Sequence, residues 1–396
     1  MNRWTILSLA CLLLSVPLAW LVLRRDMGGG AVPFVRVATF NAALNRDAPG
    51  ALLAELRAGS EQARRIAEIV QRCDVDVVLL CELDRDAAAA AADVFAEQYL
   101  ARPQRGQRAI EFPFRFAAEV NTGEPSGLDL DGDGAADGPG DAWGFGRFPG
   151  QYGMAVLSRH PIARDRVRTF RTLRWSAMPG ALRPAGLWDD ATWQQLRLSS
   201  KSHWDVPIHV LGRDVHLLCS HPTPPVFDGP EDRNGCRNHD ELRFWVDYLT
   251  PGRGDWIVDD AGVAGGFGGE HFVLLGDFNC DPIDGDARRE ALLQLLQHAR
   301  VTDPLPTSAG AVVAATDQWG ANSVQQGDPA LDTGDFDDEP GKGPGNLRID
   351  YALPSRDLVV LGAGVFWPAK HAPGRDLVDA SDHRLVWVDV GYAAPN

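Results

Sequence analysis

The chain of 396 residues lacks the cysteine spacing of a zinc site, and it contains no internal repeat. Five of its six cysteines lie beyond the first 31 residues, and none of them forms a CxxC pair. Two of them, Cys81 and Cys219, end apolar runs, which is typical of small buried residues. A zinc site built from cysteines is therefore excluded, whereas a single disulfide is not.

Excess positive charge is also missing. The net charge of −16 is opposite to the charge that tight, non-specific binding to duplex DNA requires. An acidic nuclease stays open, because a local basic groove can coexist with an acidic body. One basic stretch is present, at Arg164, Arg166, Arg168, Arg171 and Arg174.

The N-terminal 31 residues differ in composition from the rest of the chain. An apolar-rich run at residues 6–23 follows Arg3 and precedes Arg24 and Arg25. Its length lies between that of a signal peptide and that of a membrane anchor, and no clean small-x-small cleavage site follows it directly. We therefore expect an exported protein that is either secreted (or periplasmic) or held at a membrane by this segment. No protein partner can be inferred.

Residues 32–396 are predicted to form one mixed α/β domain. Apolar runs predict strands at residues 35–40, 75–81, 152–158, 196–198, 215–219, 272–275, 347–352 and 385–390. Helical spacing predicts helices at 60–70, 86–99, 238–248 and 286–298. Several strand pairs have no helix between them, which favours layered sheets over a strict βαβ array. Three Gly-, Pro- and Asp-rich stretches, at 123–150, 251–269 and 328–345, are interpreted as insertions.

The apolar run at 272–275 ends in the most informative motif. It is followed by Gly276, Asp277, Phe278 and Asn279. Because residues two apart in a strand point to the same side, the carboxylate of Asp277 and the amide of Asn279 face one point. Gly276 leaves room for a close approach of another group. This arrangement suits a hard metal, a water molecule and a phosphate oxygen.

Polar residues follow or interrupt several other predicted strands. They are Asn41, Glu82, His221, and the pair of Asp350 with the segment Asp382-His383. Each has a plain structural explanation alone, such as a turn former or a solvated strand end. Asp350 lies inside an apolar strand, so it needs a partner if it is buried. Their joint occurrence predicts a shared site.

These motifs together resemble the endonuclease/exonuclease/phosphatase family, the deoxyribonuclease I-like superfamily. The matching segments are residues 37–41 (VATFN), 80–82 (LCE), 220–222 (SHP), 276–279 (GDFN), 348–351 (RIDY) and 381–383 (SDH), and the resemblance spans about residues 34–390. It implies a four-layer sandwich of two packed mixed β-sheets flanked by helices. It also implies a divalent-metal phosphoesterase site where the strands converge.

The resemblance and the chemistry of the side chains assign metal-binding roles to three residues. Glu82 would hold Mg²⁺ (or Mn²⁺), which prefers one or two carboxylates and retains several waters. Asn41 would lie beside the metal or the phosphate, and Asp382 would be a second metal contact. The sequence after Asn41 lacks the acidic residue that some family members carry two positions on, which weakens a second metal ligand at this strand.

The remaining motif residues have expected catalytic roles. Asp277 would orient the attacking water or accept its proton, and Asn279 would fix a phosphate oxygen. His383, paired with Asp350, would be held charged and neutralise charge in the transition state. His221 would protonate the leaving oxygen, as the resemblance implies.

Two further groups of residues remain open. Lys201 and His203 either touch the substrate phosphate or belong to an exposed polar loop. The segment Asp129, Asp131, Asp133 and Asp137 has the spacing with which a calcium loop begins, but Gly140 occupies the twelfth position, so an EF-hand is not supported. We interpret it as a Ca²⁺ site, against the alternative of a solvated acidic loop.

The sequence thus predicts an exported, metal-dependent hydrolase that acts on a phosphodiester or a phosphomonoester. The identity of the phosphoester is open, and nucleic acid is one candidate. An extracellular endonuclease is the alternative within enzymes. A non-catalytic surface binding module is the alternative of another class, and such a module has no need of all the acid, base and metal positions.

Overall fold

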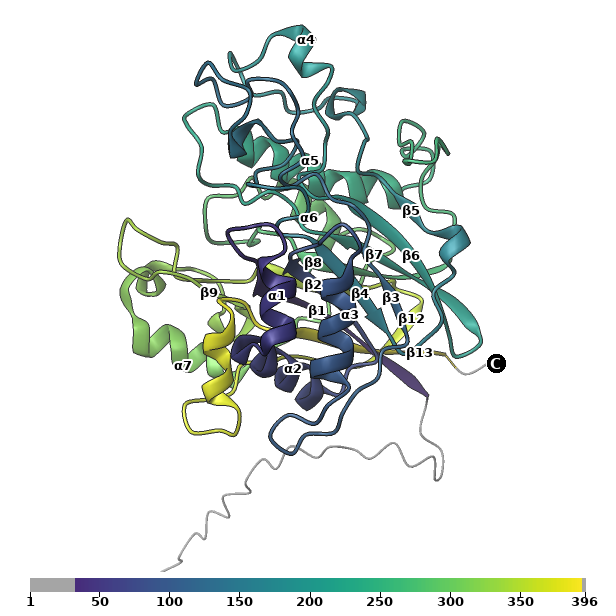
Figure 1. Cartoon of the computed structure of the whole chain (residues 1–396), viewed down its shortest axis with the longest axis vertical. Helices are drawn as coiled ribbons and strands as arrows, with labels where there is room; N and C mark the ends of the chain where they lie inside the picture. Colours follow the sequence, from purple (N-terminus) through teal and green to yellow (C-terminus); the bar gives the residue numbers. More distant parts are fainter. Residues whose placement is uncertain (1–32, 394–396) are drawn as a thin grey trace, which may run out of the picture. The chain divides into compact units, whose positions relative to one another are not determined.

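Two β-sheets lie face to face at the centre of the computed structural model, which describes residues 33–393 (Figure 1). The six-stranded sheet has the order β12-β13-β1-β2-β4-β3, with β1 Phe34–Leu44, β2 Val77–Leu83, β3 Phe114–Phe116, β4 Met154–Ser158, β12 Leu358–Val365 and β13 Val386–Tyr392. The five-stranded sheet has the order β11-β8-β7-β6-β5, with β5 Arg168–Thr169, β6 His203–Val210, β7 Arg213–Ser220, β8 His271–Asp277 and β11 Asp350–Pro354. A small ribbon pairs β9 Gly334–Asp335 with β10 Asn346–Leu347.

Helices cover the outer face of each sheet. The helices α1 Ala51–Ala58, α2 Glu61–Cys73 and α3 Ala90–Phe95 pack on the six-stranded sheet, and α3 continues as one π-helical turn, η1 Ala96–Leu100. The helices α5 Arg233–Leu249 and α6 Glu290–Leu296 pack on the five-stranded sheet. The short helix α4 Asp190–Trp193 and the helix α7 Ala309–Gln318 lie in connecting segments.

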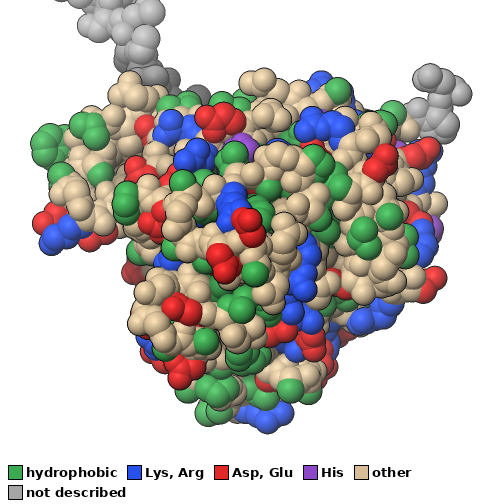
Figure 2. All heavy atoms as spheres, turned by 90° about the horizontal axis from the view of Figure 1, so that it is seen from above, with side chains coloured by type: hydrophobic (Ala, Val, Ile, Leu, Met, Phe, Trp, Pro, Cys, Tyr) green, Lys and Arg blue, Asp and Glu red, His purple; other side chains and the backbone are tan. Residues whose placement is uncertain are grey.

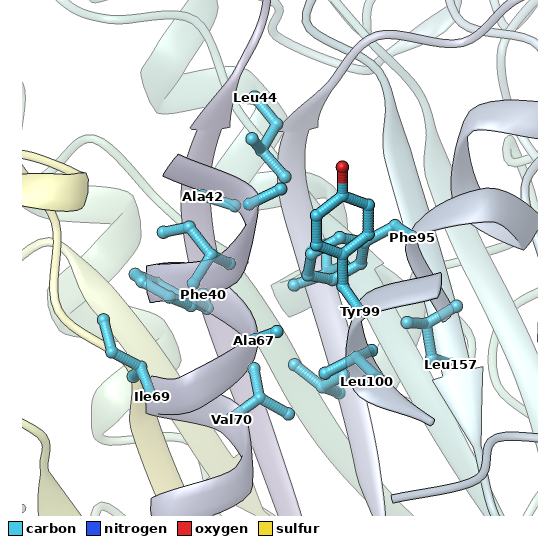
Figure 3. Close-up of a cluster of buried hydrophobic side chains, with 14 of the residues drawn as sticks. Phe40, Ala42, Leu44, Ala67, Ile69, Val70, Phe95, Tyr99, Leu100 and Leu157 are labelled. Carbon is cyan, nitrogen blue, oxygen red and sulfur yellow. The ribbon is translucent and has the colours of Figure 1, made fainter. Parts of the chain in front are cut away.

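Alternation along β1 places its side chains in two different layers of the core. Phe40, Ala42 and Leu44 point toward α2, where Ile69 and neighbouring side chains bury them (Figure 3). The other face of the same strand packs against the second sheet. Because both faces are covered, such strands read in the sequence as continuous apolar runs.

The helix α2 forms where the sequence places its cap and its apolar face. The Oγ of Ser60 accepts a hydrogen bond from the backbone N–H of Ala63 at 3.2 Å, which satisfies one of the free donors of the first turn. Ile66 and Val70 on its buried face are fully enclosed.

Two further apolar layers complete the sandwich. Val37 and Val77 of the first sheet face Val206 and Val273 of the second. On the far side of the second sheet, Leu274 and its neighbours pack against α5 and α6. The order helix, sheet, sheet, helix confirms the predicted four-layer sandwich of mixed sheets.

The strand directions bring distant parts of the sequence to one end of this sandwich. β1 is parallel to β2, and β7 is parallel to β8, so the ends of all four strands can carry side chains to the same edge. β13 is antiparallel to β1 and β11 is antiparallel to β8, so these two strands begin where the others end. Asp350 at the start of β11 pairs directly with Asp277 at the end of β8.

Several predicted elements differ in detail. The predicted strand at 347–352 is broken, because its first residue, Leu347, pairs in the β9–β10 ribbon and β11 begins only at Asp350. The short strand expected at 196–198 makes only an isolated bridge between Arg174 and Arg197. The helix expected at 86–99 begins at Ala90 and ends in a π-helical turn.

The predicted signal peptide or anchor at residues 1–31 lies outside the described residues. Within residues 33–393, no helix combines the length and the apolar character that crossing a bilayer requires. The five cysteines in this range are all free and buried, which agrees with the interpretation of Cys81 and Cys219 as core residues.

Candidate active site

One carboxylate oxygen joins the two sheets at the end where the strands converge. Oδ2 of Asp277, at the end of β8, lies 3.0 Å from Nδ2 of Asn41 in β1. It also lies 3.3 Å from Nε2 of His221 and 3.6 Å from Nε2 of His383. The other oxygen of Asp277 accepts the backbone N–H of Asn279 at 2.9 Å. Three residues from other sequence motifs, and Asn279 from the same motif, therefore meet Asp277.

A glycine makes this meeting sterically feasible. A Cβ added at Gly276 would lie 2.0 Å from the carbonyl oxygen of Ser220, which any larger residue would have to displace. The missing side chain lets β8 approach the end of β7 closely. The residue that follows Ser220 is His221, so this close approach contributes to placing its ring against Asp277. Gly276 was expected to leave room for the close approach of another group, and that group is the backbone of β7.

His383 and Asp350 form the pair that the sequence predicts. Nδ1 of His383 lies 3.0 Å from Oδ2 of Asp350, and both side chains are buried. Burial lowers the pKa of His383, but Asp350 and Asp277 raise it to about 10. Burial raises the pKa of Asp350 to about 6 despite the neighbouring His383. Near neutral pH the pair is therefore an imidazolium and a carboxylate.

The pKa values of His221 and Asp277 are lowered, in contrast to those of His383 and Asp350. Burial and the charge of Lys201 lower the pKa of His221, so its imidazole is neutral near pH 7. Burial raises the pKa of Asp277, but His383 and His221 outweigh it and hold this pKa well below its usual range. The cluster thus contains one charged and one neutral histidine on the same carboxylate oxygen.

Thr333, which the sequence analysis did not single out, fixes Asp350. Its hydroxyl donates to Oδ2 of Asp350 at 2.9 Å and accepts the backbone N–H groups of Ile349 and Asp350 at 3.0 and 2.9 Å. A lone threonine in an insertion carries no sequence signal for this role.

Glu82 lies at the end of β2, beside the cluster. Its Oε2 accepts a hydrogen bond from Nδ2 of Asn45 at 2.8 Å, and its side chain is only half-buried. Glu82, Asn279 and Tyr152 all have left-handed backbones, with φ of 56°, 50° and 54°. Such conformations are unfavourable for residues other than glycine and tend to gather at functional sites.

The residues expected to hold a metal differ in exposure, and a further group of possible ligands lies in the cluster. Asp382 is exposed, and its backbone carbonyl accepts the N–H of Asp335 at 2.8 Å. Asp277, Asp350 and His383 each offer a ligand atom within 4.8 Å of the others, although His383 already contacts both carboxylates. Oxygen and imidazole groups without thiolates suit a hard divalent cation. Glu82, half-buried and bordering a cavity, is open to a hydrated ion.

Lys201 and His203 lie in different surroundings. Lys201 is buried, borders the same cavity as Glu82, and has one long contact, 3.5 Å from its Nζ to the carbonyl oxygen of Pro222. Burial lowers its pKa. His203 is part of β6 rather than of a loop, and its ring nitrogens contact Oγ of Ser199 at 2.5 Å and the carbonyl oxygen of Glu241 at 2.9 Å. Both ring nitrogens of His203 thus already have partners within the fold, and neither residue lies in an exposed loop.

Glu241 in α5 connects two strands that carry site residues, and the sequence analysis did not identify it. Its carboxylate accepts the N–H of Ser200 and the N–H of Thr223, both at 2.6 Å, and the hydroxyl of Ser200 at 3.0 Å. It therefore ties the segment before β6, with Lys201, to the segment after β7, with His221. A glutamate within a helical pattern looks like a solvated residue, but this one is 1% exposed.

The acidic loop of the first insertion brings three of its four predicted ligands together. Asp129, Asp131 and Asp133 each offer an oxygen within 4.8 Å of the others. Asp137 is exposed and is not part of that group. The carboxylates of Asp129, Asp131 and Asp133 also accept backbone N–H groups of the loop.

A cavity of about 520 Å³ adjoins the cluster. Glu82, Tyr152, Lys201 and Thr223 border it on the catalytic side. Its remaining walls come mostly from residues 130–145, 175–197 and 223–237, which lie between or after the strands that carry the predicted motifs. Their apolar character gave no motif in the sequence.

The family model described as Endonuclease/Exonuclease/phosphatase family matches residues 38–383. The match spans most of the chain and includes every catalytic and metal position predicted from the sequence motifs. The protein therefore belongs to the endonuclease/exonuclease/phosphatase family, whose members are metal-dependent hydrolases of phosphoester bonds.

Several solved structures are similar to this chain. An endonuclease/exonuclease/phosphatase from Beutenbergia cavernae is 20% identical, with 91% of this chain and 72% of the other covered and a TM-score of 0.49. Sphingomyelinase C from Streptomyces griseocarneus is 16% identical (90% and 99% covered, TM-score 0.42). The catalytic domain of human Nocturnin with bound sulfate is 15% identical (91% and 94% covered, TM-score 0.43). No curated protein matches the sequence.

The buried imidazole of His203 gives the fold an acid sensitivity. Burial lowers its pKa to about 4, so the unfolded chain, with an ordinary value near 6.5, takes up the proton first as the pH falls. The titration of His203 therefore does not affect the free energy of unfolding above about pH 6.5. As the pH falls toward 4, it lowers this free energy by up to about 3 kcal/mol. In urea unfolding, the destabilisation caused by His203→Asn should therefore shrink between pH 7 and pH 4.5. His209→Asn, at an exposed position of β6, is the control; an unchanged difference for His203→Asn would contradict the prediction.

Glu241→Gln should destabilise the fold while keeping the shape of the side chain. The amide nitrogen would face a backbone N–H that now has an oxygen acceptor, which leaves a buried donor unpaired and costs about 1–3 kcal/mol. Urea unfolding at neutral pH measures the loss. Glu270→Gln, at an exposed carboxylate, should change the free energy of unfolding by less than about 0.5 kcal/mol. Equal stability of the two variants would mean that Glu241 does not connect the two segments.

Proposed function

We propose that this protein is a divalent-metal-dependent phosphoesterase that hydrolyses a phosphodiester or a phosphomonoester by attack of water. The observation that carries this proposal is the convergence on Oδ2 of Asp277 of one amide, one neutral histidine and one charged histidine. Phosphoryl transfer needs positioning and charge stabilisation more than covalent chemistry, and this cluster supplies both.

Glu82 and Asn41 are the residues that we propose to hold Mg²⁺ or Mn²⁺. The half-buried carboxylate of Glu82 borders the cavity, so it can bind a cation that retains part of its water. A bound divalent ion supplies positive charge to the phosphate oxygens. The expected contribution of Asp382 remains part of this proposal, and its exposed side chain lies directly before His383.

The charge states of the cluster suggest a catalytic role for each of its residues. The pKa of Asp277, well below its usual range, makes this carboxylate a weak base, so we assign it to orienting the water and the histidines. His383, charged and held by Asp350, is suited to neutralise the phosphate in the transition state. His221 is neutral in the free protein, which favours proton acceptance over its expected first role as an acid.

A nuclease is the second candidate, and the arrangement of charge does not favour it. The basic stretch noted in the sequence is largely paired: Arg166 with Asp214, Arg168 with Asp259, and Arg171 with Glu124. On the face seen in Figure 2, basic side chains are interspersed with acidic ones rather than forming one continuous patch. A strand of nucleic acid would therefore find few unpaired cations along that stretch.

Export through residues 1–31 is also part of the proposal, as a secreted, periplasmic or membrane-anchored protein. Its support is the apolar run between arginines in the sequence. Fractionation of cells that produce the full chain and a chain starting at residue 32 tests it, since only the full chain should leave the cytoplasm or reach a membrane.

Hydrolysis should require a divalent metal and His383. A panel of DNA, RNA, lipid and small phosphoesters with Mg²⁺ or Mn²⁺ tests the proposal, and excess chelator should abolish turnover of any substrate found. His383→Ala should lower kcat by roughly 10²–10⁴-fold, the usual scale for a positioned acid or base.

His209→Ala is the matched control, because this histidine is exposed and lies on β6 away from the cluster. It should keep full activity. Turnover that survives chelation would refute the metal mechanism, and near-normal turnover of His383→Ala would refute the role of the cluster. Inactivity on the whole panel would favour a binding module.

Ca²⁺ should order the acidic loop. Three carboxylates that lie within one ion's reach repel one another without a cation, so Ca²⁺ should slow proteolysis between residues 123 and 141. Limited digestion with and without Ca²⁺ measures this. Asp131→Asn with Asp133→Asn should remove the protection, whereas Asp165→Asn with Asp255→Asn, at exposed acidic positions elsewhere, should not. Equal cleavage rates with and without Ca²⁺ would favour a solvated acidic loop.

A further inference from the structure

We propose that the cavity beside the catalytic cluster binds an aromatic ring of the substrate, so that the preferred substrates are small phosphoesters carrying such a ring. This inference rests on the proposed function, because the same substrate must place its phosphate at the cluster. It goes further by naming the chemical group attached to that phosphate.

The cavity has the position and size for this role. Glu82 and Lys201 border it, and the charges of Glu82 and Asp277 act on Lys201, so a phosphate at the cluster lies next to the cavity. Its volume of about 520 Å³ falls within the range of small-molecule sites, about 300–1,000 Å³. A ring with its phosphate fits such a volume, whereas a nucleic acid duplex does not.

The walls of the cavity present aromatic and apolar surface. Trp143, Trp175, Trp188, Leu130 and Leu196 line it. The indole N–H of Trp175 is bonded to Asp240 at 2.7 Å, and that of Trp188 to the carbonyl oxygen of Leu130 at 3.0 Å. Trp175 is only 1% exposed and backs the wall, whereas Trp188 is half-buried and, with its N–H already bonded, offers a ligand its ring surface. Aromatic surfaces bind other rings in offset or edge-to-face arrangements.

Two arginines, Arg197 and Arg237, hold part of the aromatic wall in place. Arg197 lies over the ring of Trp143, 4.8 Å from its centroid, and also pairs with Glu124 and Asn121. Arg237 donates to the backbone carbonyls of Trp143, Arg197, Leu198 and Ser199. Both arginines border the cavity, and these contacts hold their side chains and the segment of Trp143 in place.

The cavity is also bordered by a large apolar side chain that is almost fully exposed. Phe227 is 89% exposed and has φ of 66°, a left-handed backbone that is a clear outlier for a bulky residue. Phe145, on the same cavity, is 63% exposed. Strain of this kind persists at ligand-binding sites, where the side chain gains contacts once the ligand is present. We expect Phe227 to cover the bound ring.

The experiment compares diesters that share one methyl group and differ in the second group: dimethyl, cyclohexyl methyl and phenyl methyl phosphate, with Mg²⁺. KM should be about tenfold lower for the phenyl ester than for the methyl ester, and the cyclohexyl ester should fall between them, because it has similar bulk without an aromatic face. Phe227→Ala and Trp143→Leu should each reduce the phenyl preference at least threefold and leave the methyl ester largely unaffected.

Trp319→Ala is the matched control, because Trp319 is also an exposed aromatic residue with a left-handed backbone, but it does not line the cavity. It should keep the full preference for the phenyl ester. Hydrolysis of all three esters with equal KM would overturn the ring site and leave the proposed function standing.

A binding measurement separates the two proposals if no ester is hydrolysed. The cavity tryptophans should report phenyl phosphate by a change in fluorescence at about tenfold lower concentration than methyl phosphate; equal affinities would overturn the inference. Phosphatidylcholine vesicles test whether the cavity binds a lipid instead. Sedimentation with vesicles that depends on Phe227, without any phenyl preference, would also overturn it and indicate a lipid substrate.

Discussion

The carboxylate of Asp277 is the constraint on which the rest of the site depends. Its Oδ2 receives Asn41 from one sheet and His221 from the other, and His383 reaches it from the segment that leads into β13. A single buried charge thus fixes three side chains that are far apart in the sequence. Without it, the charged ring of His383 would lose one of its two carboxylate contacts, which is costly in a medium of low polarity.

The same cluster shows how the fold keeps opposing charge states side by side. Asp350 and Asp277 both act on His383, whereas burial and Lys201 dominate at His221. The difference follows from what surrounds each ring and not from the ring itself. Two histidines with different pKa values are a common basis for dividing acid and base roles in enzymes.

The sequence predicted the fold class and the motif residues because continuous apolar runs mark strands buried on both faces. Polar residues at their ends were therefore informative: Asn41, His221 and Asp277 meet as the parallel strand pairs require. Asp350 was expected to need a partner, and it has His383.

Other elements could not be read from the sequence for identifiable reasons. The strand β6 was missed because its buried face includes His203 and Asp205, which look like surface residues. Asp205 is in fact bonded to His216 at 2.5 Å and to the hydroxyl of Tyr248 at 2.7 Å. Glu241 and the cavity walls escaped for the same reason, since their partners lie on segments that only the folded chain brings together.

The division of the site between two sheets ties catalysis to the packing of the middle layer. Val37 and Val77 on one sheet and Val206 and Val273 on the other set how the sheets slide against each other. A slip of about 1 Å there would shift Asn41 relative to Asp277 by a similar amount, and errors of that size can cost an enzyme about a hundredfold in rate. The apolar layer between the sheets therefore sets the relative positions of the site residues. A substitution that removes one methyl group from this layer would change those positions although it lies far from the site.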